Sequence, residues 1–170
     1  NLIYVVTSNG VDADHLEIPA PLAPSFIAVD KRLGKVVWKD NTPTAKAAQI
    51  NVPMAQRRAV IEALRNGGEL AAHGQWSNPA FTVVDGVEQV LFPGGDGWLR
   101  SFNTQGQLLW AFNGNPKNTA FQWGGKGERS EIVGTPVVAN GRVYFAMGQD
   151  PEHNVGVGHL WCVDLKKAMA

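Results

Sequence analysis

The residues best suited to chemistry in this chain lie in one short segment. Residues 123 to 129 read Trp-Gly-Gly-Lys-Gly-Glu-Arg. Glycines let a ligand approach the backbone, and the side chains of Lys126 and Arg129 can hold an anion. Glu128 can instead neutralise these cations, so a purely structural loop is the alternative. The segment predicts a ligand or partner site that includes Trp123, Lys126, Glu128 and Arg129.

Other long connections add candidates of different chemistry. Trp76 can serve as a stacking platform, and His153 and His159 lie near the end of the chain. No HExxH, paired CxxC or EF-hand spacing is present, so the pattern predicts no metal site. Gly94-Gly95-Asp96-Gly97 lacks the Lys-Ser/Thr ending of a phosphate loop and is interpreted as a hairpin turn between strands.

Composition limits the function classes. The chain has 170 residues, 44% of them hydrophobic, with 15 basic and 15 acidic residues. The balance gives no overall field for nucleic acid, and the chain shows neither an apolar run of roughly 20 residues that would span a membrane nor a signal-peptide pattern. The single Cys162 excludes an intrachain disulfide, and we expect it to be a small buried side chain rather than a nucleophile.

Internal repeats predict the architecture. The sequence of residues 78–103 is repeated at 134–164, and a third copy lacking its first strand occupies residues 3–30. Strand-like runs end at Asp85-Gly86 and at Asn140-Gly141, which suit tight hairpins. The spacing predicts an all-β chain of four-stranded antiparallel blades of a β-propeller: blade one 2–39, a helical insertion 40–75, blade two 76–112, a loop 113–133, and an incomplete blade three 134–164.

Within the insertion, residues 53–66 predict one helix. Its composition favours a helix, with Pro53 in the first turn and Gly67 as a stop. Met54, Ile61 and Leu64 have the spacing of a buried stripe.

A glycine and a tryptophan four residues apart recur in the outer strands. Gly34 precedes Trp38, and Gly106 precedes Trp110. Such a glycine can take a positive φ in a turn, and the tryptophan can dock against a neighbouring blade. The run Ala-Val-Asp-Lys-Arg-Leu-Gly-Lys-Val-Val-Trp at 28–38 resembles the tryptophan-docking repeat of quinoprotein dehydrogenases and of their non-catalytic relatives, the pyrroloquinoline-quinone (PQQ)-like propellers, including outer-membrane assembly lipoproteins.

The resemblance implies an extracytoplasmic propeller, in the periplasm or cell envelope. An active member needs PQQ, calcium ligands, a catalytic aspartate and commonly two adjacent cysteines, and no position here matches these parts securely. The resemblance therefore favours a non-catalytic binding or protein-assembly scaffold. The alternatives are part of a PQQ- and calcium-dependent alcohol or sugar dehydrogenase, and a carbohydrate-binding propeller that uses Trp76 and Trp123.

Blade geometry also predicts where binding occurs. About two and a half blades cannot close a ring of typically four to eight, so we expect the chain to be a fragment or part of a larger or oligomeric propeller, with further blades from the same or another chain. The long B–C and D–A connections, at 9–24, 40–75, 113–133 and 148–158, all fall on one face. This face is the expected site for a protein partner or small ligand.

Overall fold

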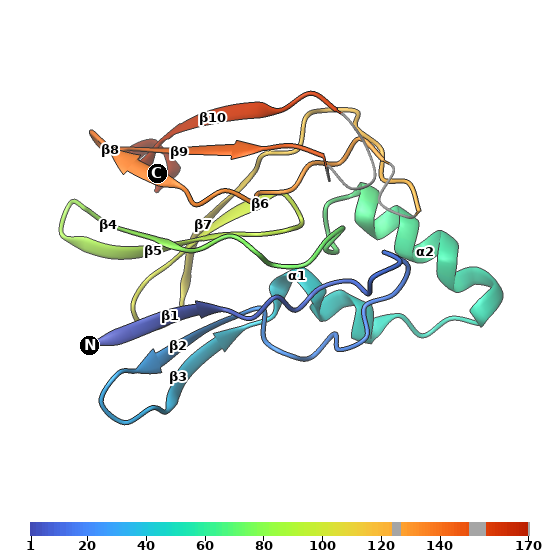
Figure 1. Cartoon of the computed structure of the whole chain (residues 1–170), viewed down its shortest axis with the longest axis horizontal. Coiled ribbons are helices and arrows are strands. Elements are labelled where there is room, and N and C mark those ends of the chain that lie inside the picture. Colours follow the sequence, from blue (N-terminus) through green and yellow to red (C-terminus); the bar gives the residue numbers. More distant parts are fainter. Residues whose placement is uncertain (124–126, 150–155, 170) are drawn as a thin grey trace.

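Three antiparallel sheets form the scaffold of the protein (Figure 1). The computed structural model describes residues 1–123, 127–149 and 156–169. Sheet 1 contains β1 (Leu2–Val6), β2 (Phe26–Asp30) and β3 (Val36–Asp40); sheet 2 contains β4 (Ala80–Val84), β5 (Val87–Pro93), β6 (Trp98–Phe102) and β7 (Leu108–Asn113); sheet 3 contains β8 (Val137–Ala139), β9 (Arg142–Met147) and β10 (His159–Asp164).

Each predicted blade region contains one sheet, and within each sheet every strand pairs with its neighbour along the chain. The all-β prediction is therefore confirmed. The described sheets form no closed ring or barrel, so their assignment as propeller blades stays a prediction.

Tight turns join the strands at one end of the sheets. Asp85 and Gly86 have φ values of 49° and 83°, and Asn140 and Gly141 have values of 51° and 71°. Two successive positive φ values are the mark of a type I′ hairpin, which matches the natural twist of the strands. The predicted Asp-Gly and Asn-Gly turns are confirmed.

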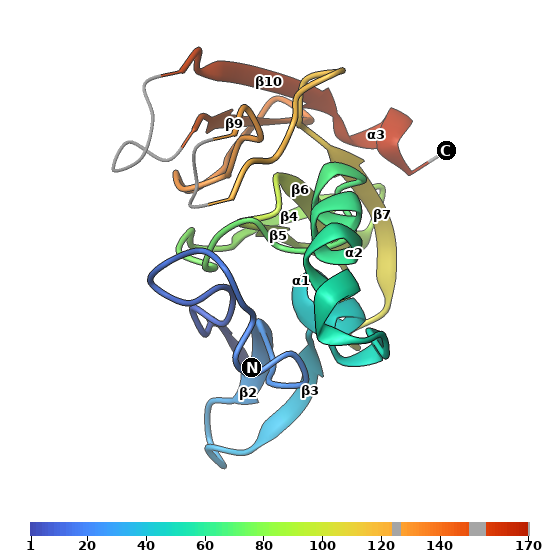
Figure 2. The same cartoon turned by 90° about the vertical axis from the view of Figure 1, so that its right-hand side faces the viewer.

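The sheets follow one another in space in chain order and bury two separate cores between them (Figures 1 and 2). Between sheets 1 and 2, Phe26 stacks on Phe92 with ring centroids 4.7 Å apart. Between sheets 2 and 3, Leu91 and Leu99 belong to the same buried cluster as Phe145. Alternation of side chains along each strand gives a central sheet two buried faces.

The predicted helix is present as α2 (Met54–Asn66), with Pro53 at its N-cap position. The predicted stripe was partly wrong, because Met54 is 81% exposed whereas Ile61 is buried against Ile18 and Leu70. Arg65 takes the remaining buried position of the helix. The sequence pattern also missed three short helices: α1 (Thr42–Ala45), η1 (Lys46–Gln49) and α3 (Leu165–Ala168). No helix among the described residues combines the length and apolarity needed to cross a membrane.

The repeated tryptophans occupy different surroundings. Trp38 of sheet 1 donates a hydrogen bond from Nε1 to the carbonyl of Thr104, at 3.0 Å, in the β6–β7 turn of sheet 2. A Cβ added at Gly106 would lie only 2.7 Å from the Trp38 ring, so the ring lies directly on that turn. Trp110 is 8% exposed and donates at 2.9 Å to Oε1 of Gln89.

Cys162 corrects the sequence interpretation. It is exposed, although its counterpart Ser101 in sheet 2 is fully buried. The two residues lie at equivalent register positions, but the face of sheet 3 that holds Cys162 and Tyr144 is covered by no other sheet of the described residues, whereas sheet 3 packs on the corresponding face of sheet 2.

Candidate functional site

The long connections gather at one end of the sheets, together with α2 (Figure 1). Figure 2 looks onto this end. We call this end the loop face. It comprises the described residues of the connections 7–25, 41–79, 114–136 and 148–158. The opposite end carries the tight turns. The short turns and the long connections therefore lie at opposite ends of the sheets.

Trp123 lies along one stripe of α2. Arg58, Glu62 and Arg65 are spaced four and three residues apart, so they share a helix face. The indole Nε1 donates to Oε2 of Glu62 at 3.1 Å, and the guanidinium carbons of Arg58 and Arg65 lie 4.9 and 5.2 Å from the ring centroid. One hydrogen bond and two cation–π contacts therefore attach the 114–136 connection to the helix.

Arg65 is the buried member of this cluster. Its side chain is 1% exposed, lies 4.6 Å over Phe121, and donates from Nη1 to the carbonyl of His15 at 2.9 Å. Burial lowers the pKa of Arg65 to about 10, against the favourable charges of Asp12 and Glu17. The guanidinium therefore stays charged at neutral pH, where aromatic faces replace much of its lost hydration.

A groove of about 180 Å³ opens beside Trp123. It is lined by Leu16, Glu17, Met54, Arg57, Arg58 and Trp123. Arg57 contacts Glu17 at 3.7 Å, whereas the exposed Arg58 has only its aromatic contact among the interactions that the structure describes. Apolar and cationic groups are therefore available side by side at this surface.

Trp76 belongs to a second cluster. Its indole is 53% exposed and lies edge-on to His73, with centroids 4.2 Å apart. His73 in turn lies 4.7 Å from His15, and both histidines are buried. The exposed indole of Trp76 therefore lies on two buried histidine rings, and His15 connects them to α2 through its carbonyl bond with Arg65.

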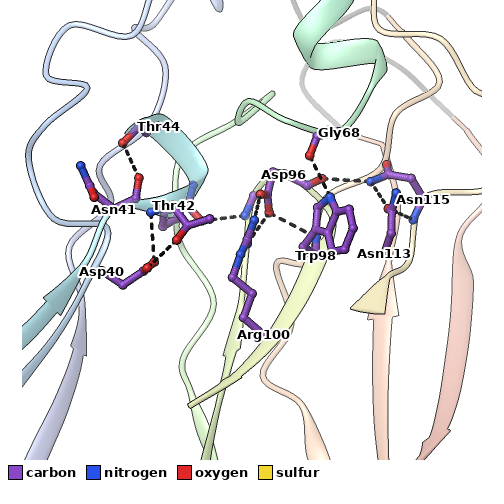
Figure 3. A network of polar contacts seen from close by, with 12 residues as sticks. Asp40, Asn41, Thr42, Thr44, Gly68, Asp96, Trp98, Arg100, Asn113 and Asn115 are labelled. Atoms are coloured by element: carbon purple, nitrogen blue, oxygen red, sulfur yellow. Dashed lines mark hydrogen bonds and ion pairs between the residues drawn. The ribbon is translucent and has the colours of Figure 1, made fainter. Parts of the chain in front are cut away.

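A polar junction links the loop face to sheets 1 and 2 (Figure 3). Asp96 forms a two-pronged ion pair with Arg100, with one contact of 3.0 Å from Nη1 to Oδ1. The amide of Asn115 donates to the backbone carbonyl of Asp96 at 2.9 Å, and the indole of Trp98 donates to the carbonyl of Gly68 at the same distance. The β5–β6 hairpin thus joins two connections, 41–79 and 114–136, beyond the simple turn that the sequence predicts.

Arg100 is held charged at this junction. Desolvation alone lowers its pKa, but the charge and hydrogen bonds of Asp96 outweigh this effect, so the pKa is raised. A cavity of about 410 Å³ lies beside the pair and is lined by α1 and η1, the Gly68-Glu69 segment, Trp98, Arg100, Leu108 and Ala111. Lys46 on its wall is already ion-paired with Glu69.

The predicted site residues are dispersed across this face. Glu128 is exposed and bound through its backbone N–H to the carbonyl of Ala120 at 2.7 Å. Arg129 is half-buried beside Gly68, and burial lowers its pKa. His159 begins β10 opposite Met147, while Lys126 and His153 lie outside the described residues.

Sequence reasoning missed the arginines of α2 and the buried pair at residues 96 and 100. Helical spacing of residues 58, 62 and 65 was a signal that could have placed them on one face. Nothing in the sequence showed which aromatic ring would meet that face, because Trp123 comes from a connection far along the chain.

Comparison with known proteins adds no family assignment. No protein-family model matches the chain, and no curated protein matches it either.

Metal ligands are not grouped within the described residues. Across 1–123, 127–149 and 156–169, no three His, Cys, Asp or Glu side chains lie close enough together to hold a metal ion.

Proposed function

We propose that this chain is a segment of a PQQ-like β-propeller that serves as a non-catalytic binding or assembly scaffold. The repeated strand pattern, the chain-order stacking of the sheets and the contact of Trp38 with the Gly106 turn support this architecture. By the same resemblance, its place is extracytoplasmic, in the periplasm or cell envelope.

The observation that carries the function is the collection of long connections on one face, with a groove at Trp123. Loops on a rigid scaffold are where proteins commonly place binding residues. The opposite end carries the tight turns, whereas the long connections of the described residues lie on the loop face.

The groove chemistry favours a protein partner over a small anion. Arginine, methionine and tryptophan are enriched at protein interfaces, and the groove presents Arg58, Met54 and Trp123 together. A free anion would meet the carboxylate of Glu17 on the same wall. A partner segment with an apolar side chain next to a carboxylate fits this groove, because the apolar group can contact Met54 and Trp123 and the carboxylate can pair with Arg58.

A matched pair of charge insertions tests this proposal. Met54→Asp changes an 81% exposed groove residue, and Leu33→Asp changes a 67% exposed residue in a turn at the opposite end. Proteins captured from native extract by each variant are quantified against the unmodified chain. We expect Met54→Asp to lower the affinity for a specific partner at least about tenfold, which corresponds to about 1.4 kcal/mol of binding free energy. Leu33→Asp should bind the same partner as well as the unmodified chain does. Equal capture by both variants would refute the loop-face assignment.

Exposure of Trp76 favours carbohydrate binding as a second candidate function. An indole that is 53% exposed can stack on a sugar ring, whereas the Trp123 ring is already held by two arginines. Titration with soluble polysaccharides should quench the tryptophan fluorescence of the unmodified chain. The same titration should leave the fluorescence of the Trp76→Ala variant unchanged. Identical titration curves would remove this candidate.

The quinone-dependent dehydrogenase is the remaining alternative. Among the described residues, no three His, Cys, Asp or Glu side chains lie together as a candidate set of calcium ligands. The absorption spectrum of the natively purified assembly, taken before and after denaturation, tests for a released quinone. A released quinone chromophore would favour the dehydrogenase over the scaffold.

A further inference from the structure

The cavity of about 410 Å³ beside Arg100 is lined by two kinds of side chain. Its charged members are Lys46, Glu69 and Arg100, and its apolar members include Trp98, Leu108 and Ala111. Cavities of roughly 300–1,000 Å³ that combine apolar surface with a few well-placed polar groups are typical small-molecule sites. The groove at Trp123 is lined by other residues, so this cavity is a separate candidate site.

Sheet 2 and the 41–79 connection build the cavity together. Trp98 and Arg100 are two residues apart on β6, and Arg100 opposes Ala111 of β7, so the three side chains share one face of the sheet. Glu69 lines the same cavity from the connection. The indole of Trp98 donates at 2.9 Å to the backbone carbonyl of the residue before Glu69 (Figure 3). This bond holds the connection against the sheet, so the cavity is formed without a ligand.

The two ion pairs at this cavity differ in burial. The side chains of Arg100 and Asp96 are 7% and 1% exposed, and Asp40 adds a further negative charge that acts on Arg100. The charge of Arg100 is therefore already compensated. The side chains of Lys46 and Glu69 are instead 48% and 45% exposed. Solvent-exposed pairs contribute little to stability, so this second pair can open at small cost.

Charge balance limits the class of ligand. A ligand with a single charge pairs with Lys46 or with Glu69 and leaves the other residue without its partner. A free anion also meets the negative charges of Asp40 and Asp96, which act on this part of the cavity. A ligand that carries an anionic and a cationic group side by side can replace both halves of the exposed pair. An apolar group on the same ligand can then lie against Trp98.

We propose that this cavity binds a free α-amino acid with an apolar side chain. The carboxylate of the ligand pairs with Lys46, its ammonium group pairs with Glu69, and its side chain packs on Trp98. Arg100 uses Nη1 and Nη2 to contact Asp96, and a guanidinium has five N–H donors, so it retains donors for the ligand carboxylate. This inference goes beyond the partner groove of the proposed function and does not depend on it.

Calorimetric titration of the chain with L-leucine and L-phenylalanine tests the ligand class. The matched control ligands lack either the ammonium group or the carboxylate: 4-methylpentanoate and 3-methylbutylamine for leucine, and 3-phenylpropanoate and 2-phenylethylamine for phenylalanine. We expect at least one amino acid to bind, and both of its analogues to bind at least about tenfold more weakly, because each leaves half of the exposed pair without a partner. Failure of both amino acids to bind, or an analogue that binds equally well, would overturn the proposal.

Substitutions in the exposed pair test the location of the site. Glu69→Gln and Lys46→Met each remove one charge from the cavity and should each lower the affinity for the amino acid at least about tenfold. Asp85→Asn is the matched control, because it breaks another exposed ion pair, with Lys166, that does not line the cavity. Circular dichroism verifies that all three variants fold. Full affinity in both cavity variants would place the ligand elsewhere and contradict the assignment.

Discussion

At the residue scale, two equivalent glycines face different surroundings. Gly106 has a φ of 83° and lies under the Trp38 ring, whereas Gly34 has a φ of 65° with no atom within 4 Å of an added Cβ. Gly34→Ala should cost about 1–2 kcal/mol through left-handed backbone strain alone. Gly106→Ala should cost about 2–4 kcal/mol, because the methyl group also displaces the indole. Urea denaturation measures both, and equal losses would contradict the contact.

The Asp96–Arg100 pair allows a second comparison at this scale. Both side chains are buried, so Asp96→Asn leaves an uncompensated guanidinium and should cost about 3–5 kcal/mol. The surface pair of Asp85 and Lys166 is 2.7 Å apart, but its side chains are 64% and 68% exposed. Asp85→Asn should therefore cost less than about 1 kcal/mol. Thermal unfolding in parallel checks the ranking, and a reversed order would show that the buried pair is not structurally important.

At the scale of elements, α2 and the connection that contains Trp123 stabilise each other. Trp123→Ala removes the hydrogen bond to Glu62 and two cation–π contacts, so it should cost about 1–3 kcal/mol and expose residues 114–123 to protease. Trp76→Ala is the control, because that indole is half exposed and its ring contact is with His73. Cleavage rates under limited proteolysis distinguish the two; unchanged rates in Trp123→Ala would contradict the attachment.

The strands and turns of this chain were predictable because their signals are local. Alternating apolar residues and the Asp85-Gly86 and Asn140-Gly141 pairs determine strand position and hairpin type without reference to distant residues. Helix α2 was likewise found from its composition, but its buried side was not. Met54 has helical spacing with Ile61, yet it is 81% exposed, and Arg65 is buried instead.

The candidate site was less predictable, for a physical reason. Trp123 was singled out from its own segment, but its partners Arg58 and Arg65 lie far away along the chain. The burial of a charged residue such as Arg65 depends on rings that arrive from other connections. Cys162 shows the same limit, because its exposure depends on whether another sheet covers its face.

At the scale of the whole molecule, the two separate cores predict that the sheets respond independently to damage. Phe92 is fully buried between sheets 1 and 2, and Phe145, 2% exposed, lies between sheets 2 and 3. Each change to alanine should cost about 3–5 kcal/mol. In repeated structures, contacts are made mainly with neighbours, so the effect should be local.

Hydrogen exchange can locate that effect. Phe92→Ala should accelerate exchange in β1 to β3 and leave β8 to β10 protected, while Phe145→Ala should do the reverse. The two substitutions are matched in chemistry and in burial, so only their position distinguishes them. Uniform acceleration in both variants would instead show that the three sheets unfold as one cooperative unit, in which case the interfaces could not be weakened one at a time.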